Sequence, residues 1–176
     1  MPVVDFHDHQ STINRRRTKM TSKQKITPFL WFDKEAGEAA EFYNSIFKGS
    51  KIKETRKLGN TPSGTVEIVT IELLGQDFTF MSAGPFVKFN ESISFVVPCE
   101  TQKEIDYYWE KLSADPKAEQ CGWLKDKYGL SWQIIPTILA KMQKDKDKTK
   151  VARVTQAFLK MKKFDIGELK RAYEGK

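Results

Sequence analysis

The hydrophobic pattern of residues 26–135 predicts short strands and two helices. Runs of alternating or continuous apolar residues indicate strands, whereas apolar residues three or four positions apart indicate an amphipathic helix. The first helix carries small and aromatic residues on one face, namely Ala36, Ala39, Ala40, Tyr43 and Phe47. The predicted strands are 26–32, 51–58, 65–74, 77–82, 92–98, 120–125 and 130–135, and the predicted helices between them are 34–47 and 101–112.

Local signals indicate how several of these elements begin and end. Gly75-Gln76 separates two alternating runs, and a two-residue loop with glycine first predicts a hairpin turn. Thr101 and Glu104 have the spacing of a capping box, which predicts the start of a helix. The composition of residues 59–64 predicts a loop. Pro28 places the first strand at a sheet edge or near a bulge, because proline cannot donate to a ladder.

The order of strands and helices occurs twice along the chain. The first strand and helix correspond, at an offset of 66 residues, to strand 92–98 and the helix after Thr101. Each half then continues with further strands, so the sequence predicts an α+β fold of two paired modules. We expect the paired modules to span residues 25–140, after a disordered N-terminal extension at 1–24. The extension at 141–176, with helices at 136–144, 148–162 and 166–173, is expected to pack on the modules or on a dimer partner.

Charge is distributed unevenly along this chain of 176 residues. Residues 26–140 hold 12 basic and 16 acidic residues, whereas residues 141–176 hold 12 basic and five acidic ones. Residues 1–25 add six basic residues and two aspartates. The basic surplus therefore lies at the two ends and not on the predicted modules. We expect no nucleic-acid partner, although a partner bound through the basic ends stays open as an alternative.

Histidine and cysteine are scarce, which limits the chemistry available. No histidine follows His9, so the modules lack the usual general base and commonest metal ligand. His7 and His9 lie in the extension predicted to be disordered, where they would not be preorganised for metal. Cys99 and Cys121 do not make a disulfide framework and are predicted to be reduced thiols of a cytoplasmic protein. No apolar run is long enough to span a bilayer.

Three sequence motifs resemble a known superfamily. Residues 27–32, leading to Ala39-Ala40-Glu41-Phe42-Tyr43, resemble the opening of vicinal-oxygen-chelate proteins, which include glyoxalase I, extradiol dioxygenases and bleomycin-resistance proteins. Residues 84–95 and 121–133 resemble its PhnB-like branch, which is labelled demethylubiquinone methyltransferase. The resemblance covers about residues 25–173. It implies paired βαβββ modules, half-open sheets that enclose a cup for a ligand, and a homodimer.

The resemblance also implies a metal in active relatives, and the matching positions can be checked. A first-strand histidine of relatives aligns with Pro28, and a last-strand glutamate aligns with Gln133. Glu72 is then the one anionic candidate, and three protein ligands are usual for a catalytic ion. We therefore expect no metal and no other cofactor. No glycine-rich loop follows a strand and opens a helix, so the usual cradle of S-adenosylmethionine is not evident either.

These observations predict a PhnB-like protein that binds a small apolar or amphipathic molecule and forms a homodimer. An enzyme of the same superfamily is the alternative, and the sequence leaves open whether any reaction is catalysed. Cys121 is interpreted as a structural thiol, because no histidine can act as its base. The residues expected to line the cup are Trp31, Glu72, Phe80, Ser82, Phe89, Asn90, Cys121, Trp123, Trp132 and Gln133.

Overall fold

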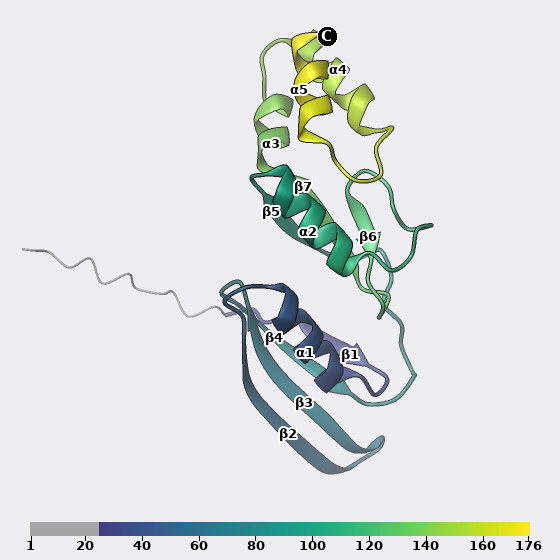
Figure 1. Cartoon of the computed structure of the whole chain (residues 1–176). Coiled ribbons are helices and arrows are strands. Elements are labelled where there is room, and N and C mark those ends of the chain that lie inside the picture. The colour runs from purple at the N-terminus through teal and green to yellow at the C-terminus, as the bar shows by residue number, and fades with distance from the viewer. Residues whose placement is uncertain (1–24) are drawn as a thin grey trace, which may run out of the picture.

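Two α/β modules and three C-terminal helices make up the computed structural model, which describes residues 25–176 (Figure 1). The predicted disorder of residues 1–24 lies outside the described residues. The first module contains β1 (Phe29–Phe32), α1 (Ala36–Ile46), β2 (Lys51–Thr61), β3 (Gly64–Leu73) and β4 (Gln76–Ser82). The second module contains β5 (Ser94–Cys99), α2 (Gln102–Leu112), β6 (Trp123–Lys125) and β7 (Ser131–Pro136). The chain ends in α3 (Thr137–Gln143), α4 (Lys148–Phe158) and α5 (Ile166–Glu174).

Each module has one mixed sheet. The first sheet has the order β1-β4-β3-β2, and its strands are antiparallel except for the parallel pair β1 and β4. The second sheet has the order β5-β7-β6, with β5 parallel to β7. The α+β class and the paired-module fold are confirmed. Within the described residues, the second sheet has one strand fewer than the first.

Several local predictions are confirmed, and one turn was predicted one residue too late. The capping box of Thr101 and Glu104 starts α2, and the Asp165 side chain accepts a hydrogen bond from the backbone of Glu168 at the start of α5. The hairpin turn consists of Leu74 and Gly75, with φ values of 49° and 84°, and not of glycine and Gln76. Both positions need the left-handed region, so the turn has two positive φ angles and Gln76 pairs in β4.

Helices α1 and α2 lie on the same side of the molecule, each in front of its own sheet (Figure 1). The rings of Phe47, directly after α1, and Tyr108 in α2 stack with centroids 5.5 Å apart, and Tyr107 donates a hydrogen bond to the carbonyl of Ile46. One continuous hydrophobic core fills the space between these helices and both sheets. We call this side of each sheet the covered face, and the opposite side the open face.

The C-terminal helices pack against the second module of the same chain. Phe164 and Leu169 are buried in the common core, and the Gln102 side chain of α2 bonds the backbone of Phe164 and Ile166. Figure 1 places α3, α4 and α5 at the end of the molecule away from the first module. These helices therefore do not cover the first module.

Candidate functional site

The open face of the first sheet carries a small apolar patch. Strand alternation directs Leu30 and Phe32 to the covered face, so Trp31 lies on the open face. Trp31 and Met81 pack there against Val66 and Ile68, in a cluster separate from the main core. The Trp31 indole N–H donates to the carbonyl of Gly84 at 2.9 Å, which fixes the ring.

The open face of the second sheet combines polar and apolar side chains. Trp132 and Ile134 point into the core, so Ser131 and Gln133 lie on the other face of β7. Gln133 pairs in register with Trp123 of β6 and with Val96 of β5, which places all three on the open face. The Gln133 amide donates to the Ser94 hydroxyl at 2.8 Å.

Three of the predicted cup residues lie on the covered face instead. Phe80 is fully buried, and its ring contacts Phe32 and Tyr43. Trp132 is 3% exposed and packs against Phe47, which directly follows α1. The Ser82 hydroxyl accepts the backbone N–H of Ala36 at 2.9 Å and so satisfies the start of α1. Phe80 and Trp132 therefore have almost no surface for a ligand, whereas Ser82 is half-buried and lines a separate hollow with Lys57 and Glu67.

Glu72 is ion-paired, and the expected metal ligands do not fit a divalent ion. Its carboxylate lies 2.7 Å from the ammonium of Lys53, which also contacts Asp77 at 2.5 Å. Asp77 and Glu72 raise the pKa of Lys53, so the ammonium stays charged and competes with any cation. The Gln133 amide donates a hydrogen bond to Ser94, and the Pro28 side chain has no atom that could bind a metal. Among residues 25–176, no group of three His, Cys, Asp or Glu side chains could hold a metal ion.

The linker between the modules forms one wall of a groove with a volume of about 350 Å³. Trp31 and Phe89 line it from the first module and the linker, and Lys127 and Tyr128 line it from the second module. The Lys127 ammonium lies 4.7 Å from the centre of the Phe42 ring and 2.6 Å from a Glu38 carboxylate oxygen. This groove brings two of the predicted residues together. Asn90 lies outside it, in a linker turn with Ser92.

Cys121 has a backbone role that agrees with a structural thiol. Its φ is 51°, and that of Gly122 is 82°, so two successive residues are left-handed. Their N–H groups donate to the carbonyls of Met161 at 2.8 Å and Lys162 at 2.7 Å. A Cβ on Gly122 would lie 2.4 Å from the ring of Phe164. The Cys-Gly pair thus binds the C-terminal segment to the second module.

A buried carboxylate joins the two modules, and the sequence analysis did not single it out. Asp126 is 3% exposed, and its Oδ2 accepts the Tyr43 hydroxyl at 2.6 Å and the Trp132 indole N–H at 2.8 Å. Its Oδ1 accepts the backbone N–H groups of Tyr128 and Leu130. Burial raises the pKa of Asp126, while these hydrogen bonds oppose the rise. An aspartate that opens a turn commonly accepts backbone N–H groups of that turn, so these two bonds are expected from the sequence. Nothing in the sequence around Asp126 indicates its contact with Tyr43.

The fold and motifs define the class: a vicinal-oxygen-chelate protein of the PhnB-like branch. Residues 24–135 match the model of the 3-demethylubiquinone-9 3-methyltransferase family, and the chain belongs to this family. The structure is similar to that of the PhnB protein from Bacillus cereus, with 33% sequence identity and a TM-score of 0.55. The match covers 65% of this chain and 100% of the relative.

More distant similarity is structural. The protein PA1353 from Pseudomonas aeruginosa shares 16% identity at a TM-score of 0.50, over 64% of this chain and 97% of the other. A search of curated proteins found no match. No helix within the described residues is long and apolar enough to cross a membrane.

Proposed function

We propose that the protein binds a small apolar or amphipathic molecule in a cup formed by the open faces of its sheets, without a metal centre. The observation that carries this proposal is that α1 and α2 cover the same side of the two sheets (Figure 1), whereas Phe29 and Val96 on the opposite faces are each 56% exposed. The open faces present indole rings, small hydroxyls and an amide, the mixture of apolar walls and few polar groups that is usual in ligand sites.

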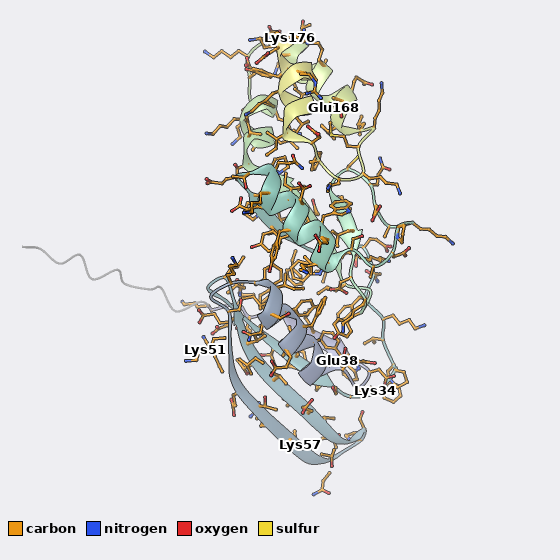
Figure 2. All side chains as sticks on the ribbon, viewed as in Figure 1. Lys34, Glu38, Lys51, Lys57, Glu168 and Lys176 are labelled. Carbon is orange, nitrogen blue, oxygen red and sulfur yellow. The ribbon has the colours of Figure 1, made fainter. Side chains whose placement is uncertain are left out.

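We further propose that a second copy of the chain closes the cup. The open faces expose large apolar side chains, with Phe29 and Val96 each 56% exposed and Leu58 54% exposed. Charged residues of β2 lie on the same face, including Arg56, which pairs with Ile68, and Lys51, which pairs with Glu72 and is labelled in Figure 2. An apolar centre with a polar rim is typical of a protein interface, and homodimers are the commonest soluble oligomers.

Methyl transfer is the reaction that the family name suggests. The three junctions where a described strand leads into a helix, at residues 33–35, 100–101 and 136–137, contain no glycine. They therefore lack the glycine-rich turn with which a strand–helix junction cradles a nucleotide-like cofactor. This composition favours ligand binding over methyl transfer as the proposal.

The test compares two substitutions of equally exposed apolar residues. Val96→Asp places a charge on the open face, whereas Leu74→Asp places one at the hairpin turn, where the native side chain is also 56% exposed. We expect light scattering after size exclusion to show a dimer for the wild type and for Leu74→Asp and a monomer for Val96→Asp. Native mass spectrometry should find a small molecule retained by the two dimers and lost from the monomer. A monomeric wild type, or a Val96→Asp dimer that retains ligand, would contradict the proposal.

A further inference from the structure

The groove between the modules lies apart from the positions that correspond to the metal ligands of relatives. Phe32 and Asp33, at the C-terminal end of β1, line the groove, whereas Pro28 and Gln133 do not. Its other walls come from the linker and from the turn between β6 and β7. Its volume of about 350 Å³ is that of a small-molecule site, and such sites often lie where two units of a fold meet. The chemistry of these walls therefore indicates what the groove binds.

Aromatic rings supply the apolar walls of the groove. The Trp31 indole N–H already donates to a backbone carbonyl, and the Tyr128 hydroxyl donates to Glu38 at 2.9 Å. Phe89 packs edge to face against Phe32, with the ring centres 5.2 Å apart. Because the polar atoms of Trp31 and Tyr128 are engaged within the protein, these rings offer a ligand apolar contact. Polar recognition in the groove must come from other side chains.

Charged side chains of both signs line the same groove. Asp33 and Glu35 come from the junction of β1 with α1, and Lys88 comes from the linker. Lys127 comes from the turn between β6 and β7, and its ammonium is held by Glu38. Among the described residues, Asp33, Glu35 and Lys88 take part in no ion pair. The groove thus presents two carboxylates and one ammonium whose charges are not paired within the protein.

These charges favour a ligand that carries both signs. A ligand with only a positive charge is repelled by Lys88, and one with only a negative charge is repelled by Asp33 and Glu35. A zwitterion can place its ammonium beside the carboxylates and its own carboxylate beside the lysine, so both pairings are attractive. The aromatic walls add a preference for an apolar group on the same molecule.

We propose that the groove is a second binding site, which takes a small zwitterion with an apolar side chain, the class to which the free aromatic amino acids belong. The ammonium of the ligand lies at Asp33 and Glu35, and its carboxylate lies at Lys88. Its side chain packs against the rings that line the groove. This site is distinct from the proposed cup, and it does not depend on which molecule the cup binds.

The test uses four probes that differ by one group. L-Phenylalanine carries both charges, 2-phenylethylamine lacks the carboxylate, 3-phenylpropionate lacks the ammonium, and L-alanine lacks the ring. Titration of the ¹⁵N-labelled full chain is followed through the indole signal of Trp31, with that of Trp123 on the open face of the second sheet as reference. We expect L-phenylalanine to bind about threefold more tightly than either singly charged analogue, a ratio in keeping with one exposed ion pair. L-Alanine should bind about tenfold more weakly, because it leaves the apolar walls uncovered.

Two variants each remove one of the proposed pairings. The exposed side chains of Asp33 and Lys88 make no hydrogen bond or ion pair within the described chain, so Asp33→Asn and Lys88→Gln should fold as the wild type does. Lys88→Gln should weaken L-phenylalanine and 3-phenylpropionate about twofold to threefold and leave 2-phenylethylamine at least as tightly bound. Asp33→Asn should weaken L-phenylalanine and 2-phenylethylamine and spare 3-phenylpropionate. Glu41→Gln and Lys103→Gln, exposed positions that do not line the groove, are matched controls and should leave every affinity unchanged.

The outcomes separate this site from the cup. Equal affinity for L-phenylalanine and its two singly charged analogues would overturn the proposal, and so would variants that weaken all four probes alike. A shift of the Trp123 signal without one of Trp31 would also overturn it, because the probe would then bind on the open face. If L-phenylalanine shifts neither signal, the groove is not such a site, and the cup still stands or falls by the Val96→Asp experiment.

Discussion

The two faces of each sheet carry similar residues but differ in how far their side chains are exposed. Val97 on the covered face of β5 is 3% exposed, whereas its neighbour Val96 on the open face is 56% exposed. On the covered side, the carboxylate of Asp126 is supplied with four donors. On the open side, the hydroxyl of Ser131 has none within the described chain. The covered face is packed within one chain, whereas the open face leaves a large apolar side chain exposed.

This difference indicates where stability resides and where we propose that the ligand binds. The covered faces of both modules share one core, so removing a group there should lower the free energy of unfolding. The open faces contribute little to that core, and in the proposed function their exposed apolar groups contact a ligand or a second copy. Substitutions on the two faces should therefore separate stability from binding.

The largest effect is expected for Asp126→Ala. The substitution leaves the Tyr43 hydroxyl, the Trp132 indole N–H and two backbone N–H groups without their acceptor. Each unsatisfied buried group costs about 1–3 kcal/mol, so we expect a loss of at least about 4 kcal/mol in the free energy of unfolding. Urea denaturation measures the loss, and Asp126→Asn should cost less because its amide oxygen still accepts the backbone bonds. A loss under about 1 kcal/mol would show that the network does not join the modules.

A smaller loss is expected for Gly122→Ala. The new Cβ would lie 2.4 Å from the Phe164 ring and 3.0 Å from the carbonyl of Ile134, at a φ of 82°. Overpacking and left-handed strain together should cost about 3 kcal/mol. Gly129→Ala is the matched control, because its φ is also 82° but no atom lies within 4 Å of the added Cβ. Equal thermal midpoints for the two variants would show that the contact with Phe164 is unimportant.

Val97→Ala and Val96→Ala compare the two faces directly. Val97→Ala removes buried methyl groups and should cost about 2 kcal/mol. Val96→Ala should change the free energy of unfolding by no more than about 0.5 kcal/mol at protein concentrations low enough to keep the chain monomeric. Chemical denaturation of both variants in parallel gives the difference. Similar losses would mean that the open face is covered within the monomer.

The smallest effect concerns the two thiols. Burial raises the pKa of the Cys99 thiol to about 12, so at pH 8 about one molecule in 10⁴ carries its thiolate. Cys121 is half-buried. A disulfide reagent at pH 8 should therefore modify one thiol per folded chain and the second only after denaturation. Rapid reaction of Cys99 would show that the covered face opens readily.

Much of the fold was predictable because its signals are local. Strand alternation and the capping box at Thr101 depend on residues close together in the sequence. The repeat at an offset of 66 residues is found by comparing such local patterns in the two halves of the chain. The hairpin register was predicted one residue off, because exposed Leu74 adopts a left-handed conformation that apolar residues seldom take.

The site was predictable only in part, because alternation does not say which face of a strand a helix will cover. Trp31, Trp123 and Gln133 lie on the open faces, whereas Phe80 and Trp132 lie beneath the helices. Asp126 is buried although it lies in the turn between β6 and β7. Its burial depends on Tyr43, which is 83 positions away in sequence, and no pattern near the turn indicates that contact.

The pair of bonds between the Cys121-Gly122 backbone and residues 161–162 has a consequence for the order of folding during synthesis. The second module cannot satisfy these N–H groups until residue 162 has left the ribosome, whereas the first module is complete at Ser82. The second module therefore cannot complete its hydrogen bonds until the C-terminal helices have been synthesised. A chain that stops shortly before Met161 should leave these N–H groups unpaired, and because both modules share one core, the loss should lower the stability of the whole fold.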